Sequence, residues 1–272
     1  MSVQFKSTRG DKTLITASQA IVKGISGDGG LYVPCAIPKI DFELKKILEM
    51  SYKELAYEVL KLIISDFTEE ELKYCIEKAY DSKFDTDLIA PLKTAGGEHF
   101  LELFHGKTLA FKDMALSILP YLLKTAAKKN GVNEKIVILT ATSGDTGKAA
   151  LEGFADVEDT KIIVFFPEDG VSPVQKRQMV TQTGKNTCVA GIKGNFDDAQ
   201  TAVKQIFTDK KLNEELKSKG YIFSSANSIN IGRLAPQIVY YFFAYAQMVK
   251  NGEINFGEKI NFTVPTGNFG DI

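Results

Sequence analysis

The chain has 272 residues, of which 44% are hydrophobic and 25% charged, and its 33 basic and 34 acidic side chains leave a net charge of −1. This composition is typical of a globular protein with one or two domains, and the balanced charge argues against electrostatic binding to nucleic acid or to an anionic membrane. No apolar run approaches the roughly 18 residues of a membrane-spanning helix, and the first residues lack the apolar core of a signal peptide. Three widely spaced cysteines form no disulfide framework. We therefore expect a cytoplasmic protein.

The first 92 residues predict a mixed N-terminal domain. It begins with short strand-like segments and a glycine-rich turn at residues 24–34, GISGDGGLYVP. Two helices are predicted to follow, over residues 51–64 and 68–80. Thr68 precedes three consecutive glutamates, and this order favours Thr68 as the N-cap because acidic side chains stabilise the first turn of a helix.

From residue 92 onward, strand-like and helix-like segments alternate. Five short, mostly apolar segments predict strands that are buried on both faces: residues 136–140, 162–166, 187–190, 222–224 and 260–264. Helical patterns cover residues 114–129, 146–154, 173–182, 196–207, 213–219 and 231–250, and Pro120 should kink or delay the first of them. The alternation predicts an open α/β fold with a largely parallel sheet flanked by helices.

One lysine, Lys112, lies in an apolar segment between Phe111 and Asp113. An ammonium group among apolar neighbours is expected to lose hydration, and lost hydration lowers the pKa of a lysine. A lysine with a lowered pKa can attack a carbonyl carbon and hold it as a Schiff base. The alternative is a surface lysine whose stem packs beside a helix, and this segment taken alone favours that alternative.

A loop of small residues, ATSGDTGKAA at residues 141–150, follows a predicted strand and begins a helix. In open α/β sheets ligands bind past the carboxyl ends of strands, and here backbone N–H groups could face an anion. The segment does not match a nucleotide phosphate loop, because Thr142 replaces the first glycine and Ala149 replaces the residue that should bind magnesium. The alternative is a plain strand-to-helix turn capped by Thr146.

Two further segments follow predicted strands. Residues 265–272, PTGNFGDI, can present consecutive N–H groups to an anion between Gly267 and Gly270. Residues 224–233 lead into a long helix and end at Arg233, whose forked donors suit phosphate or carboxylate; an N-cap followed by a surface arginine is the alternative. The two histidines, His99 and His105, are too few for a typical metal cluster, and His105 is more simply a structural residue than part of a catalytic pair.

Taken together, the segments resemble the threonine synthase family of fold-type II pyridoxal 5'-phosphate enzymes. The matching pieces are FKSTRGDK, GISGDGGLYVP, LFHGKTLAFKD, TATSGDTGKAA, GVSPVQKRQM, NSINIGR and GNFGD, in the family's order over nearly the whole chain. The resemblance implies a fold like the tryptophan synthase β subunit, with an N-terminal domain over residues 1–92 and an incomplete cofactor-binding core over residues 93–272. Because the chain stops at Ile272, inside a strand-to-helix loop, we expect a fragment that lacks its C-terminal part and is inactive and poorly stable alone.

The resemblance also implies roles for individual residues. Lys112 would hold pyridoxal 5'-phosphate as a Schiff base. The phosphate of this cofactor would lie on the loop formed by Gly267, Asn268, Phe269, Gly270 and Asp271. The substrate carboxylate would lie on Thr142, Ser143, Gly144, Asp145 and Thr146, and the substrate phosphate on Asn227, Arg233 and, more weakly, Ser228.

The implied reaction converts O-phospho-L-homoserine and water to L-threonine and phosphate by elimination and replacement at the β and γ carbons. We expect a monomer or homodimer, and the composition gives no sign of binding to a metal ion, nucleic acid or a membrane. Three alternatives stay open. One is a serine/threonine dehydratase or β-replacement synthase with the same cofactor, although such relatives usually carry S-x-G-N-x-G where this chain has TSGDTG. The others are a non-catalytic homologue that binds phosphorylated ligands, and a structural fragment that assembles with a separate chain.

Overall fold

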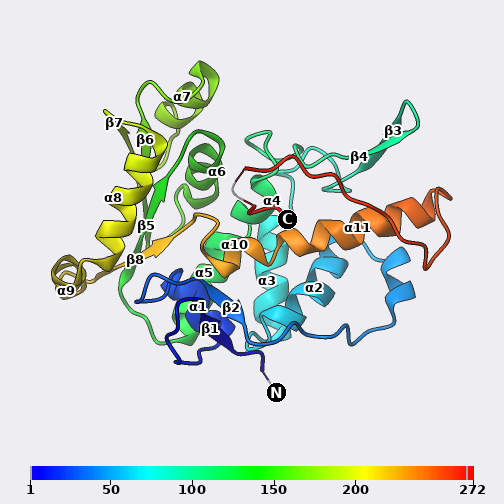
Figure 1. The fold of residues 1–272 in the computed structure, drawn as a ribbon, viewed down its shortest axis with the longest axis horizontal. Coiled ribbons are helices and arrows are strands. Elements are labelled where there is room, and N and C mark those ends of the chain that lie inside the picture. Colours follow the sequence, from blue (N-terminus) through cyan, green and yellow to red (C-terminus); the bar gives the residue numbers. More distant parts are fainter. Residues whose placement is uncertain (1, 268) are drawn as a thin grey trace.

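The computed structural model describes residues 2–267 and 269–272. A four-stranded parallel sheet in the order β7–β6–β5–β8 organises the second half of the chain (Figure 1). Its strands are β5 (Lys135–Ala141), β6 (Thr160–Pro167), β7 (Thr187–Ile192) and β8 (Tyr221–Ser225). These four match four of the five predicted strands, and the open α/β architecture is confirmed.

Helices cover both faces of the sheet, as expected for strands that are apolar at nearly every position. Alternate residues of β5 explain the two layers: Val137 and Leu139 pack with α8 (Phe196–Thr208), whereas Ile136 and Ile138 belong to the larger core that includes α6 (Asp145–Phe154). Figure 1 shows α8 and α6 on opposite sides of β5. Both helices begin at the carboxyl edge of the sheet, where ligands bind in folds of this kind.

The predicted strand at residues 260–264 is wrong. This segment has no regular structure and runs back along α11 (Gln237–Lys250), away from the sheet, where Phe262 packs edge-on against Tyr241 with ring centroids 4.9 Å apart (Figure 1). A strand needs a neighbouring strand to accept its backbone hydrogen bonds, and among the described residues none lies beside this segment. Phe262 therefore packs on a helix instead of pointing into a sheet core.

Proline sets two helix boundaries. The predicted helix at residues 231–250 is divided into α10 (Ile231–Leu234) and α11, because Pro236 lacks the N–H that a continuous helix requires. Pro120 lies in the first turn of α5 (Leu119–Lys129), after the short α4 (Asp113–Leu116), so the predicted late start is confirmed. Helix α7 (Pro173–Val180) matches its prediction within two residues, whereas α9 (Lys210–Ser218) begins three residues earlier than expected because Asp209 caps it.

The N-terminal residues pack directly on this core. Their elements are β1 (Phe5–Ser7), α1 (Ala17–Lys23), β2 (Tyr32–Pro34), the 3₁₀ helix η1 (Leu44–Leu48), α2 (Tyr52–Ile63) and α3 (Glu69–Ala79), followed by the hairpin of β3 (Leu92–Ala95) and β4 (Glu98–Leu101). Thr68 caps α3 in a capping box with Glu71, as predicted. One continuous apolar cluster joins residues of α1, α2 and α3 to residues of α5 and α11, so the division at residue 92 stays a prediction. No helix among the described residues is long and apolar enough to cross a membrane.

Asp28, in the glycine-rich turn, connects the first N-terminal segments. Its carboxylate accepts hydrogen bonds from the backbone of Gly30 (2.9 Å), the hydroxyl of Ser7 (2.8 Å) and the backbone of Asp11 (3.0 Å). The Gly30 N–H and the Ser7 hydroxyl hold the pKa of Asp28 well below its usual range. Hydrogen bonds to the ionised form therefore stabilise this turn.

We expect Asp28→Asn to lower the midpoint of urea unfolding at neutral pH. Because the folded-state pKa lies below the unfolded value of about 3.9, the stabilisation is present above that pH and is lost as the pH falls toward the folded pKa. The difference from the unmodified chain should therefore shrink as the pH drops below about 4. Exposed Asp169, changed to asparagine, is the control. A difference that stayed constant with pH would contradict this account.

Gly153 allows α6 to cross close to α4, which follows Lys112 directly. A Cβ atom at this position would overlap the carbonyl oxygen of Leu116. Since that oxygen belongs to backbone, Gly153→Ala should force the helices apart and lower the free energy of unfolding by about 1–3 kcal/mol. Urea denaturation measures the change, and Gly27→Ala is the control because a Cβ atom at Gly27 would meet nothing within 4 Å. Equal effects at both glycines would contradict the close approach.

Candidate active site

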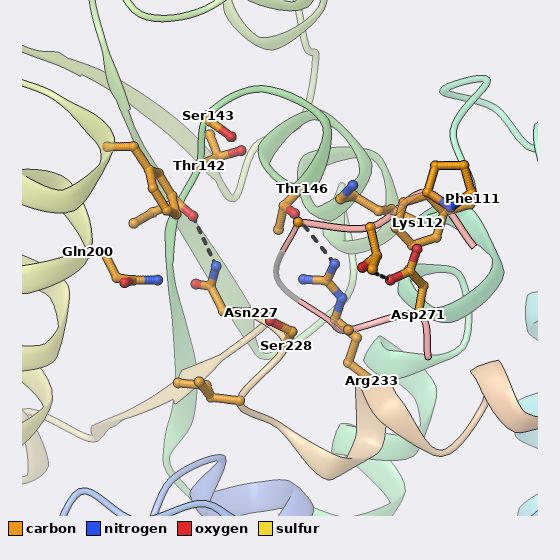
Figure 2. A pocket seen from close by; sticks show the side chains of 17 residues that line it. Phe111, Lys112, Thr142, Ser143, Thr146, Gln200, Asn227, Ser228, Arg233 and Asp271 are labelled. Atoms are coloured by element: carbon orange, nitrogen blue, oxygen red, sulfur yellow. Dashed lines mark hydrogen bonds between the residues drawn. The ribbon is translucent and has the colours of Figure 1, made fainter. Parts of the chain in front are cut away.

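The segments singled out in the sequence converge on one cavity of about 430 Å³ at the carboxyl ends of β5 and β8 (Figure 2). This volume lies within the range of small-molecule sites. Ten of the predicted site residues line it: Lys112, Thr142, Ser143, Thr146, Asn227, Ser228, Arg233, Gly267, Gly270 and Asp271. Residues distant in sequence are thus brought together around one space.

Three other predicted site residues, Gly144, Asp145 and Phe269, do not line the cavity. Gly144 turns the loop with a φ of 146°, and the carboxylate of Asp145 lies 3.9 Å from the amine of Lys112. Phe269 is exposed and has a φ of 54°. Asn268 lies outside the described residues.

Lys112 is largely buried, beside one aromatic ring and several charged groups. Its side chain is 19% exposed, and its amine lies 4.1 Å from the ring centroid of Phe111. Burial lowers the pKa of Lys112; the charges of Asp145 and Asp271 oppose this change, while Arg233 and Lys148 reinforce it. A larger fraction of Lys112 is therefore in the neutral, nucleophilic form than for a surface lysine at the same pH.

The loop after β5 owes its shape to Thr142. Its hydroxyl oxygen accepts hydrogen bonds from the backbone N–H groups of Gly144 and Gly147, both at 2.9 Å. Gly147 permits the close approach, because a Cβ atom there would lie 2.5 Å from the Thr142 methyl group. Thr142 thus orders the loop, whereas Ser143 and Thr146 face the cavity at the N-terminus of α6, which favours an anion.

Arg233 is the most deeply buried charged group in the lining, at 3% exposure. It donates to the carbonyl of Ala226 (2.9 Å) and the hydroxyl of Thr146 (3.4 Å), but its buried Nε has no hydrogen-bond partner among the described residues. Burial lowers the pKa of Arg233 to about 10, with the charge of Asp271 opposing, so the guanidinium stays charged at neutral pH. A buried cation with an unused donor is well suited to bind an anion.

Asn230 and Asn227 set the backbone that carries Arg233. The amide of Asn230 is fully buried and donates to the carbonyls of Ile21 and Ser225, both at 3.0 Å, while its oxygen accepts from Gly232. Asn227 donates to the carbonyl of Ala141 at 3.0 Å, which joins the loop after β8 to the end of β5 (Figure 2). The N-terminal helix α1 therefore helps to position the anion-binding side of the cavity.

The last residues close one side of the cavity. The carboxylate of Asp271 accepts from the hydroxyl of Thr266, and the carbonyl of Asp271 accepts from Tyr240 (3.1 Å) and Tyr241. Only glycine fits at position 270, because a Cβ atom there would lie 2.8 Å from the Cβ atom of Ser228. These contacts hold the loop near both Lys112 and Arg233 (Figure 2).

The sequence interpretation missed two lining residues on α8, Phe196 and Gln200. Gln200 points from α8 into the cavity (Figure 2). A usable signal was present: α8 follows a strand, so its first turns lie at the carboxyl edge, and residues four apart share one face of a helix.

Other candidate groups lie elsewhere. His105 lies outside the cavity between Glu102 (3.0 Å) and Asp85 (2.5 Å), and its ring stacks on Phe104, which agrees with a structural role. Burial alone would lower the pKa of His105, but these two carboxylates raise it. The described residues contain no cluster of three or more possible metal ligands.

Known proteins are similar to this chain in both sequence and fold. A family model of the threonine synthase N terminus matches residues 4–80. Threonine synthase of Schizosaccharomyces pombe is 39% identical over 280 residues, covering 99% of this chain, and human threonine synthase-like 1 is 41% identical over 266 residues, covering 94%. The crystal structure of PLP-bound threonine synthase from Brucella melitensis superposes with a TM-score of 0.84 at 38% identity over 99% of this chain. Over nearly its whole length, this chain resembles threonine synthases.

The fold-type II class predicted from the sequence is thereby confirmed. The chain spans about half the length of the S. pombe and B. melitensis proteins, 53% and 56%, and about a third of the human protein, 35%.

Proposed function

We propose that Lys112 is the catalytic lysine and Arg233 the phosphate-binding arginine of a threonine synthase. Such an enzyme is a carbon–oxygen lyase that converts O-phospho-L-homoserine and water to L-threonine and phosphate. One observation carries this proposal: Lys112 and the buried cation Arg233 line the same cavity. A dehydratase acting on serine or threonine has no use for such a cation, because its substrate bears no phosphate.

The residues present fit pyridoxal 5'-phosphate as the cofactor. Lys112 supplies an amine of lowered pKa for its aldehyde, and the backbone near Gly267 is open, since a Cβ atom there would meet nothing within 4 Å. A phosphate could therefore approach the N–H groups of this loop closely. When bound, the cofactor supplies a conjugated ring that takes up the electron pair left at the substrate Cα.

The residues of this chain would bind the substrate and move its protons. The N-terminus of α6, with Ser143 and Thr146, would bind the substrate α-carboxylate. Lys112, once free as a neutral amine, would take the proton from Cα and move protons at Cβ. Arg233 and the amide of Asn227 would stabilise the negative charge of the phosphate that leaves Cγ, and water would then supply the hydroxyl at Cβ.

Assays of phosphate, threonine and keto-acid formation test the proposal in the protein that contains this chain. We expect phosphate release from O-phosphohomoserine with an equal yield of threonine, and no comparable formation of pyruvate from serine or ketobutyrate from threonine. Faster keto-acid formation would instead indicate a dehydratase. Binding of O-phosphohomoserine that requires its phosphate group, without any turnover, would indicate a non-catalytic homologue.

A further inference from the structure

Lys148 is a buried lysine that the proposed chemistry does not use. It lies in α6 and is 7% exposed. Its amine donates to the carbonyl of Thr108 at 2.9 Å and lies 3.3 Å from the Oδ1 atom of Asp145. A buried ammonium is costly unless it is paired and hydrogen-bonded, so these two contacts account for its burial.

The contact with Thr108 reaches the loop that carries Lys112. The backbone N–H and hydroxyl of Thr108 donate to the carboxylate of Asp113 at 2.8 and 2.6 Å, which closes the loop around Phe111 and Lys112. Gly106 permits this closure, because a Cβ atom there would lie 2.5 Å from that of Asp113. Lys148 therefore fastens the closed loop to α6.

The contact with Asp145 reaches the amine of Lys112 itself. The Oδ1 atom of Asp145 accepts from the amide of Gln175 at 2.7 Å and also faces Lys148, whereas its Oδ2 atom lies 3.9 Å from Lys112. One carboxylate is thus shared between two lysines, and the nearer one is Lys148. A carboxylate already paired with one cation offers less stabilisation to a second.

We propose that Lys148 is a positioning residue that fastens the Lys112 loop to α6 and competes with Lys112 for Asp145, so that the Lys112 amine is left partly uncompensated. The groups that act on Lys112 from the surrounding elements are two carboxylates, Asp145 and Asp271, and two cations, Arg233 and Lys148. The inference rests on the proposed role of Lys112.

The pH dependence of Lys112 acetylation in the ligand-free protein tests the inference. Acetic anhydride reacts with the neutral amine, and mass spectrometry of the peptide that carries Lys112 gives the rate at each pH. In Lys148→Met, Asp145 would compensate Lys112 alone, so the midpoint should rise and the rate at a fixed pH below it should fall about threefold or more. Asp145→Asn should move the midpoint in the opposite direction.

Two controls separate charge from fold. Lys148→Arg keeps the charge and Lys128→Met removes an exposed helical lysine, so neither should move the midpoint. If Lys148→Met fails to fold by circular dichroism, Lys148→Gln, which can still donate to Thr108, replaces it. A midpoint that stays in place or falls in the uncharged variant overturns the inference. The test uses no cofactor or substrate, so its outcome does not depend on whether the proposed reaction occurs.

Discussion

Replacing Lys112 by alanine is expected to abolish covalent attachment of pyridoxal phosphate and to slow phosphate release from O-phosphohomoserine by a factor of about 10⁴. The expected loss is large because one side chain would supply both the attachment point and the amine that moves protons at Cα and Cβ. Steady-state phosphate release and retention of the cofactor through gel filtration measure the two effects.

Lys107→Ala is the matched control for this variant. Lys107 lies five residues earlier in the same loop, but it is exposed and does not line the cavity. It should keep both the cofactor and the activity. Retention of substantial turnover in Lys112→Ala would show that another group performs the proton transfers and would contradict the assignment.

Arg233→Met is expected to raise the KM for O-phosphohomoserine by at least about 30-fold, since removing one partner of a buried charge pair costs about 2–5 kcal/mol. The guanidinium offers forked donors to phosphate, and its Nε has no other partner among the described residues. Methionine keeps much of the apolar stem, so the change isolates the charge and the donors.

The comparison that isolates the phosphate uses two ligands. Binding of homoserine, which lacks the phosphate, should change much less in Arg233→Met than binding of O-phosphohomoserine. Arg177→Met, at an exposed position on α7, should leave both unchanged. Equal weakening of both ligands in Arg233→Met would indicate a general disturbance of the loop after β8 and would refute a phosphate-binding role.

The parts of the fold that were predicted correctly depend on local patterns. Strands β5 to β8 are short, apolar runs in a sheet covered on both faces, and Thr68 and Pro120 mark helix starts through contacts within a few residues. The segment at residues 260–264 is also short and partly apolar, but its Phe262 packs on Tyr241 of α11 and the segment joins no sheet. Local periodicity reports burial and cannot reveal whether a partner strand is present.

The candidate site shows a similar division. Loops after strands could be placed at one edge of the sheet, and their small and basic residues indicated anion binding. The sequence could not show that the Thr142 hydroxyl is used to order its own loop, or that Lys148 and Lys112 share Asp145. Those features depend on the directions of side chains and on how separate segments pack together, which no local pattern encodes.

The most direct test of the account locates the lysine that binds the cofactor. The protein that contains this chain is mixed with pyridoxal phosphate, reduced with borohydride and digested, and the modified peptide is identified by mass spectrometry. The account predicts stoichiometric modification of Lys112. Modification centred on Lys148 or on exposed lysines, with Lys112 unmodified, would contradict it.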